Sequence, residues 1–481
     1  MHRRIFLCYA RNMKIIPHGA ALEVTGSCHE IQVDIDGVTK KILLDCGLFQ
    51  GHRQESAVKN AEFAFEPSEI DAMILSHAHA DHVGRVPVLS KKGFEAKIFC
   101  TYATKDLAEV MLQDSGFINE KDEEFFCKYL AKSMMECEGP LYTQEDATEC
   151  MRHFVGQNYK EWFDVIPGIR AMFLDAGHII GAAMVVLEIM ENGTKRMIGF
   201  TGDLGRNMLP IIRDPADMPE VEVLICESTY GNREHEDIAT AKHALKDVII
   251  RTAKRGGKVL IPAFSLERTQ EIVYDLHVLW DAKDIPAIPI VIDSPLATRV
   301  TEVFMKHPEC YDKDMYENFL AKAHNPFQFS LVRYTQSTEE SKELNGTPGP
   351  MIIMAGSGMC EAGRIRHHLK NEIEDDRNTI LAVGYMAENT LGRSIIDSDV
   401  TEVKIFDKIY QKKAETVYIN AYSGHADMSD LDNLVCSTKG VKKVILVHGE
   451  ETQMLPFAER IRHVCKDIEV IMPERDQEIE V

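Results

Sequence analysis

The chain has 481 residues, of which 45% are hydrophobic and 27% charged, and its formal net charge is −22. This length predicts at least two domains. No apolar run reaches the roughly 18 residues of a membrane span, and the excess of acidic residues disfavours a broad nucleic-acid-binding face. The twelve cysteines are scattered without a Cys-x-x-Cys pair, which indicates a reducing, cytoplasmic location rather than a disulfide framework or a zinc ribbon.

Short strands dominate the first part of the chain. Residues 1–12 are basic and then apolar, and we expect them to be an N-terminal extension outside the fold. Strand patterns with turns run from residue 13 to about 100, charged helical patterns follow to about 155, and strands return between 171 and 200.

From about residue 231 the pattern changes to alternating helices and strands, with apolar strands at 258–261, 288–292 and 351–354. Such alternation predicts a parallel sheet flanked by helices. Residues 337–350, rich in Ser, Glu, Gly and Pro, are predicted as a loop, and a helix is predicted from residue 361. Strand patterns continue after 415.

A dense histidine cluster follows the apolar run at residues 71–75. His77, His79, Asp81 and His82 lie within six residues, too close together for all of them to turn toward one ion. We expect His77 and His79 to bind one metal, and Asp81 and His82 a second. Imidazole with carboxylate suits zinc, and a two-metal site suits hydrolysis.

Further ligand candidates stand at the ends of later strand patterns. His178 is the expected third nitrogen for the first metal, Asp203 the carboxylate that bridges both ions, and His448 a ligand of the second metal. Asp45 also ends a strand, and it is expected to orient a ligand histidine rather than to bind metal.

These residues, in this order, resemble the metallo-β-lactamase superfamily, and later segments resemble the β-CASP nucleases within it. This branch includes the endonuclease subunit of the cleavage and polyadenylation specificity factor and its bacterial and archaeal homologues. The resemblance runs from about residue 13 to 475, and residues 226–231, 423–427 and 447–450 match motifs A, B and C.

The resemblance implies an α/β fold: an αββα metallo-β-lactamase sandwich with an inserted parallel-sheet β-CASP domain, and an active site in the cleft between them. The implied limits are 13–230 for the first part of the sandwich, 231–414 for the β-CASP domain and 415–481 for the completion of the sandwich. Two zinc ions per chain are the implied cofactors. His448 at motif C implies single-stranded RNA as the substrate.

Catalysis needs a proton for the leaving ribose oxygen. We expect His425 to act as the general acid, with Glu227 fixing its tautomer and raising its pKa, and Asp81 to be part of the catalytic metal site. Ser357 and Arg364, at a Gly-rich turn before the predicted helix, and Arg393 are candidate contacts to RNA phosphates. A tight turn with surface arginines is the alternative.

The predicted function is therefore zinc-dependent hydrolysis of RNA, endonucleolytic with 5′ exonucleolytic cleavage as a further mode. One alternative is a hydrolase of small esters or thioesters with the same fold. The other is a catalytically inactive RNA-binding scaffold. A homodimer is compatible with the sequence, and neither the RNA target nor the base preference follows from it.

Overall fold

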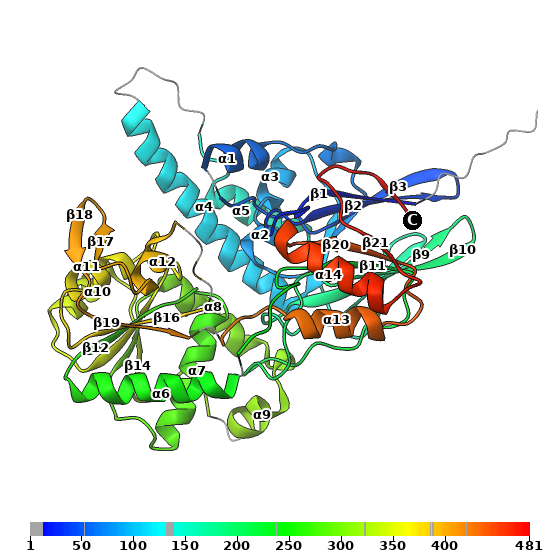
Figure 1. The fold of residues 1–481 in the computed structure, drawn as a ribbon. Coiled ribbons are helices and arrows are strands. Elements are labelled where there is room, and N and C mark those ends of the chain that lie inside the picture. Colours follow the sequence, from blue (N-terminus) through cyan, green and yellow to red (C-terminus); the bar gives the residue numbers. More distant parts are fainter. Residues whose placement is uncertain are drawn as a thin grey trace, which may run out of the picture. The chain divides into compact units, whose positions relative to one another are not determined.

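The computed structural model describes residues 13–51, 53–130, 139–236, 238–321, 324–384, 386, 389–419 and 421–481. The predicted extension at residues 1–12 lies outside them. The chain divides into two compact units, which are described separately below (Figure 1). Unit 1 consists of the residues up to Asn207, Asp214–Glu234 and His425–Val481, and unit 2 of Met208–Arg213 and His235–Gly424.

Unit 1 contains two seven-stranded sheets. The first has the order β22-β1-β2-β3-β4-β5-β6, and the second the order β21-β20-β11-β10-β9-β8-β7. The first sheet comprises Lys14–Gly19 (β1), Cys28–Ile35 (β2), Val38–Leu44 (β3), Ala72–Ile74 (β4), Lys97–Thr101 (β5), Phe154–Gln157 (β6) and Ile479–Glu480 (β22). The second comprises Trp162–Ile166 (β7), Ile169–Asp175 (β8), Ala183–Glu191 (β9), Thr194–Phe200 (β10), Val223–Glu227 (β11), Lys443–Val447 (β20) and Glu469–Ile471 (β21).

One apolar core joins these sheets. Ile31 and Ile42 of the first sheet and Val185, Phe200 and Ile225 of the second are buried in the same cluster. Central strands such as β11 are buried on both faces, which explains why they read as continuous apolar runs rather than as alternating patterns.

Helices flank both sheets of unit 1. Helix α4 packs against β5 and β6, and helix α14 packs against β21 (Figure 1). The helices are Arg53–Ala61 (α1), Ala80–Val83 (α2), Val86–Lys91 (α3), Tyr102–Leu130 (α4), Gln144–Cys150 (α5), Met428–Ser437 (α13) and Glu451–Val464 (α14). The αββα layering predicted from the resemblance is therefore confirmed.

Unit 2 is built on a six-stranded sheet with the order β14-β13-β15-β12-β16-β19. All its strand pairs are parallel, as the alternation of helices and strands predicted. Its strands are Lys258–Pro262 (β12), Ile290–Ile292 (β13), Val332–Tyr334 (β14), Met351–Ala355 (β15), Thr379–Val383 (β16) and Glu415–Ile419 (β19).

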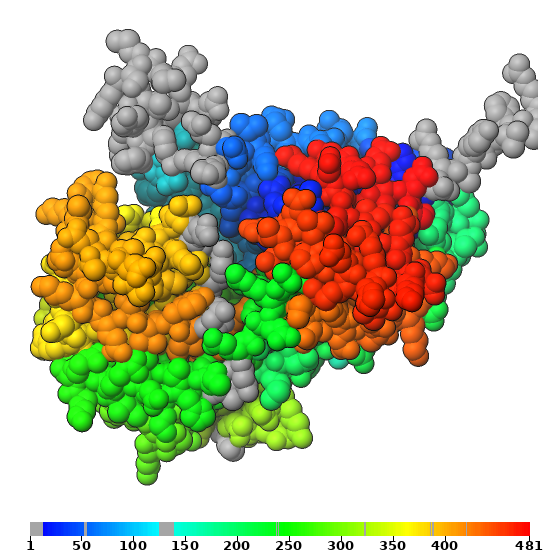
Figure 2. All heavy atoms as spheres, in the orientation of Figure 1, coloured from blue at the N-terminus to red at the C-terminus, as the bar shows by residue number. Residues whose placement is uncertain are grey.

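Helices and one hairpin complete unit 2. The helices are Ile238–Lys254 (α6), Arg268–Asp281 (α7), Pro295–Lys306 (α8), Lys313–Met315 (α9), Thr338–Gly346 (α10), Ile365–Glu372 (α11) and Leu391–Ile396 (α12). The antiparallel hairpin consists of Glu402–Ile405 (β17) and Lys408–Gln411 (β18). Figure 2 shows the same view with all heavy atoms.

Three features of unit 2 differ from the sequence-based expectation. The predicted loop at 337–350 contains helix α10, because Ser337 and Glu340 form a capping box that satisfies its first turn. The helix predicted from residue 361 begins only at Ile365. Strand β19, which follows the expected domain limit at 414, pairs with β16 and so belongs to the sheet of unit 2.

Among the described residues, none of the helices combines the length and the apolar character that crossing a membrane requires.

Candidate active site

The predicted ligand residues of unit 1 lie at the carboxyl ends of strands. His77 follows β4, His178 follows β8, Asp203 follows β10 and His448 follows β20. Asp81 and His82 lie in helix α2, one turn beyond His77. The fold therefore brings together side chains that are separated by up to several hundred residues in sequence.

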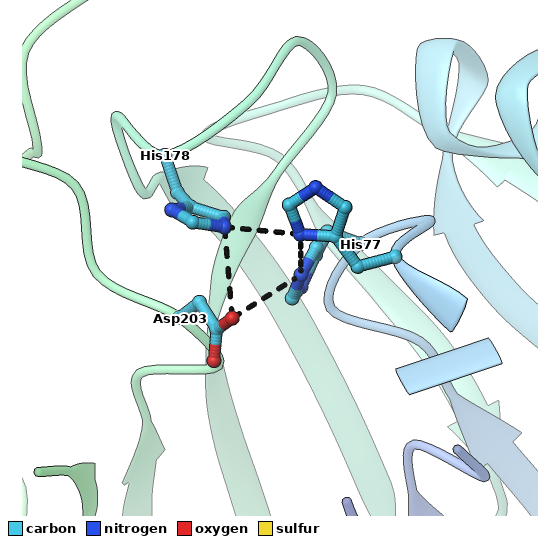
Figure 3. A group of neighbouring side chains, drawn as sticks. His77, His178 and Asp203 are labelled. Atoms are coloured by element: carbon cyan, nitrogen blue, oxygen red, sulfur yellow. Dashed lines mark hydrogen bonds and ion pairs between the residues drawn. The ribbon is translucent and has the colours of Figure 1, made fainter. Parts of the chain in front are cut away.

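Four of these side chains form a first donor group. The Nδ1 atom of His79 lies 3.1 Å from Nε2 of His77 and 3.1 Å from Nε2 of His178. Both Nε2 atoms lie 3.5 Å from Oδ2 of Asp203. Figure 3 shows His77, His178 and Asp203 pointing toward one another from three separate segments.

A second donor group lies on the other side of Asp203. Its Oδ1 atom is 3.1 Å from Nε2 of His82 and 3.3 Å from Nδ1 of His448. The two histidine Nε2 atoms are 3.3 Å apart, and Nε2 of His448 is 3.5 Å from Oδ2 of Asp81. The two oxygens of one buried carboxylate thus face two different groups of nitrogens.

The geometry and the ionisation of the first donor group fit zinc. Ligand atoms about 2.0–2.1 Å from a tetrahedral ion lie roughly 3.3 Å apart, close to the separations in the first group. In the second group, His448 faces Asp203 with Nδ1 and faces His82 and Asp81 with Nε2. Burial lowers the pKa of His79 to about 4 and, together with nearby His82, lowers that of His77 well below its ordinary value, so both imidazoles are neutral donors. Burial opposes ionisation of Asp203, but His448 and His82 outweigh it and hold the pKa of this carboxyl well below its ordinary value.

Asp45, the expected orienting carboxylate, lies beside His82. Its Oδ2 atom lies 2.7 Å from Nδ1 of His82, which directs Nε2 of that ring toward Asp203. The backbone N–H of Ser76 donates to Oδ1, and the hydroxyls of Ser76 and Ser27 donate to Oδ2. This network fixes a buried carboxylate and, through it, the orientation of a candidate ligand histidine.

Three hydroxyl residues around the donors were not identified from the sequence. The Ser76 hydroxyl lies 3.0 Å from Nδ1 of His77, and the Thr229 hydroxyl lies 3.1 Å from Nδ1 of His448. Ser27 completes the set through its bond to Asp45. Ser76 is adjacent to a ligand candidate and Thr229 lies in motif A, so their positions in the sequence could have indicated a role at the site.

Glu227 and His425 lie beside these donors and contact each other. Glu227 is fully buried at the end of β11, and its Oε1 atom accepts a 2.5 Å bond from the backbone N–H of Leu204. Nδ1 of His425 lies 3.3 Å from the same oxygen. His425 is partly exposed and its Nε2 has no hydrogen-bond partner within the described parts of the chain.

The electrostatics of this pair favour a protonated imidazole. Burial disfavours the charged ring of His425, but the charge and hydrogen bond of Glu227 outweigh burial and raise the pKa of His425 to about 9. A histidine that holds its proton near neutral pH, with one nitrogen fixed and the other unbonded, is suited to proton donation.

The three predicted phosphate contacts lie in unit 2. The Arg364 guanidinium donates to Asp293 at 2.6 Å, to the Thr335 hydroxyl at 3.2 Å and to a backbone carbonyl. The Ser357 hydroxyl accepts from the backbone of its own turn, and Arg393 is exposed in the first turn of α12. Contact of these residues with RNA stays a prediction.

Three family models match the chain in separate regions. The metallo-β-lactamase superfamily model matches residues 26–108, the β-CASP domain model matches 269–395, and the model of a Zn-dependent metallo-hydrolase RNA specificity domain matches 409–473.

Curated relatives match nearly the whole chain. It is 37% identical to "Ribonuclease TTHA0252" of Thermus thermophilus, over 92% of this chain and 94% of that protein. It is 30% identical to "Transcription termination factor FttA" of Methanocaldococcus jannaschii, over 93% and 68% of the two chains. It is 31% identical to "Cleavage and polyadenylation specificity factor 73" of Drosophila melanogaster, over 92% and 60%.

Among solved structures, a protein of unknown function from Enterococcus faecalis matches with a TM-score of 0.53 and 15% identity, over 98% of this chain and all of that chain. At this identity the likeness shows a shared fold alone. The matched models and relatives agree with the sandwich and the inserted parallel-sheet unit. The chain therefore belongs to the β-CASP family of the metallo-β-lactamase superfamily, whose members are metal-dependent hydrolases.

Proposed function

We propose that this protein is a zinc-dependent ribonuclease that hydrolyses phosphodiester bonds of single-stranded RNA with two zinc ions. The observation that carries the proposal is the position of Asp203 between two donor groups, next to the Glu227–His425 pair. The RNA specificity model and relatives named as a ribonuclease and as RNA-processing factors support RNA as the substrate.

Each zinc ion has its own proposed set of ligands. His77, His79, His178 and Asp203 would hold the first ion, and Asp81, His82 and His448 the second. Asp203 would be shared, because its other oxygen faces His82 and His448. When bound, zinc supplies Lewis acidity, which lowers the pKa of water and offsets negative charge that develops on phosphoryl oxygens.

The protein's own residues supply the proton transfer. His425 donates from Nε2 to the leaving ribose oxygen, and Glu227, at Nδ1, holds the ring in the tautomer and orientation that this transfer requires. A positioned general acid of this kind contributes about 10²–10⁴-fold to the rate. Burial lowers the pKa of His425, but Glu227, together with Asp203 and Asp81, outweighs burial and raises it, which favours the protonated ring.

The expected mode is endonucleolytic, with 5′ exonucleolytic cleavage as a second mode. An inactive scaffold is disfavoured because the chain keeps both donor groups and the Glu227–His425 pair. A hydrolase of small esters is disfavoured because the chain matches the β-CASP domain model and the RNA specificity domain model.

The test is incubation of the purified protein with end-labelled single-stranded RNA and, in parallel, with simple esters and thioesters. We expect internal cleavage of RNA and none of the esters, and an Asp81→Ala, His82→Ala variant should be inactive. Intact RNA with hydrolysed esters would show that the substrate class is wrong. Intact RNA and intact esters, with RNA bound, would favour the scaffold.

A further inference from the structure

Unit 2 carries two strongly basic segments, and they differ in how their charges are paired. In the segment at 251–258, Arg251 and Arg255 both pair with Glu415, and Lys258 pairs with Glu372. Among the described residues, carboxylates therefore contact three of the four cations of this segment, all but the exposed Lys254. In the segment at 364–370, Arg364 pairs with Asp293 in the same way. Its neighbours Arg366 and Lys370 do not pair with a carboxylate among the described residues.

Arg366 and Lys370, one turn apart on helix α11, contact an aromatic ring instead of a carboxylate. The Arg366 guanidinium carbon lies 4.4 Å, and the Lys370 ammonium 5.6 Å, from the centre of the Phe406 ring. Arg366 also donates to the backbone carbonyl of Glu361. Within the described part of the chain neither side chain has an ion-pair partner, so both are held in place without being neutralised.

Two more residues extend this surface. The His367 ring lies 4.9 Å from the Phe406 ring, and Lys342, exposed on helix α10, adds a further positive charge near His367. Burial, followed by Lys370, lowers the pKa of His367, which agrees with a cationic surrounding. We call Lys342, Arg366, His367, Lys370 and Phe406 the α11 patch.

The α11 patch lies where helices α10 and α11 meet the β17–β18 hairpin, which carries Phe406 at its turn (Figure 1). The Phe406 side chain is 38% exposed although it is large and apolar. The hairpin turn also holds one acidic residue, Asp407. Unpaired cations around an exposed ring stand out on a chain whose net charge is −22.

We propose that the α11 patch is a binding surface for single-stranded RNA, separate from the metal donors, which takes phosphates on its cations and a base on Phe406. Cations beside an aromatic ring are the usual means of holding single strands without sequence preference. An acidic polypeptide would use the cations but gives no reason for the exposed ring. The proposal deepens the proposed function, because it assumes that RNA is the substrate.

The experiment measures binding of a labelled single-stranded RNA of about 20 nucleotides at salt concentrations from about 50 to 200 mM. The full-length His425→Ala protein serves as the background, so that cleavage does not consume the probe. Arg366→Gln with Lys370→Gln should weaken binding by about tenfold and reduce the slope of log K against log salt by about 1.4, the value for two phosphate contacts on a single strand.

A matched control removes two exposed lysines of the same unit, Lys254→Gln with Lys313→Gln, and should change neither affinity nor slope. Phe406→Leu keeps both charges, so affinity should fall while the slope stays the same. If both double variants lost the same RNA affinity, the effect would come from the net charge of the protein and not from the patch, which would overturn the proposal. Unchanged RNA binding in both would overturn it as well.

Polyglutamate is the second probe. Polyglutamate binding that is lost in the Arg366→Gln, Lys370→Gln variant, with RNA binding intact, would assign the patch to an acidic polypeptide and overturn the proposal. Failure of the proposed function is distinguished by a different readout, since it would appear as uncleaved RNA with the wild-type protein whatever the binding measurements show.

Discussion

Replacing Asp45 with asparagine tests whether a residue outside the donor groups controls the zinc site. Asp45 is fully buried and acts only as an acceptor, for His82, Ser76 and Ser27. An asparagine cannot accept all these bonds, because one end of its amide is a donor. If that end faces His82, the proton of the ring moves to Nε2, the atom that faces Asp203; if it faces Ser76, the backbone N–H there loses its acceptor.

Loss of such an orienting carboxylate costs about 10–100-fold in metal affinity, which corresponds to about 1.4–2.8 kcal/mol. The assay is competition for zinc between the protein and a chromophoric chelator. We expect Asp45→Asn to weaken the ion held by His82, while Asp36→Asn, the same change at an exposed turn, has no effect. Zinc affinity equal to wild type in Asp45→Asn would refute the orienting role.

Three further predictions concern proton transfer and pH. His425→Ala should retain its zinc by elemental analysis and lose about 10²–10⁴-fold in RNA cleavage; loss of zinc would instead make this residue a ligand. Because the pKa of His82 lies well above its ordinary value and the ring must lose its proton to coordinate, zinc affinity should rise with pH, by about tenfold per unit below that pKa. A pH-independent affinity in zinc titrations at several pH values would contradict this. Finally, Asp476 lies 2.8 Å from His18, whose pKa is raised. In urea unfolding, the difference in stability between wild type and Asp476→Asn should be largest below about pH 6.5 and should shrink as pH rises through the raised pKa of His18. A difference that grows with rising pH would contradict this prediction.

The strand ends made much of the site predictable. His77, His178, Asp203 and His448 each follow an apolar run. Strands β8, β10 and β20 run in the same direction in one sheet, so His178, Asp203 and His448, which follow them, lie at the same edge. The alternation of helices and strands after residue 231 likewise predicted a parallel sheet, since both faces of such a sheet are covered by helices.

Other features depend on contacts that sequence spacing does not reveal. Arg364, a candidate phosphate contact, pairs with Asp293, 71 residues away, and nothing in the sequence indicated this ion pair. Helix α10 was predicted as a loop from its Ser, Gly and Pro content, although Ser337 and Glu340 have the spacing of a capping box. The capping-box spacing therefore predicts this helix better than the composition of the segment does.

The central claim is a ribonuclease site that needs two zinc ions, and its most direct test is a zinc titration of metal-free protein with RNA cleavage as the readout. Cleavage should be absent without metal and should reach its plateau at about two equivalents of zinc per chain. Full cleavage without metal, or a plateau below one equivalent, would contradict the two-metal site built around Asp203.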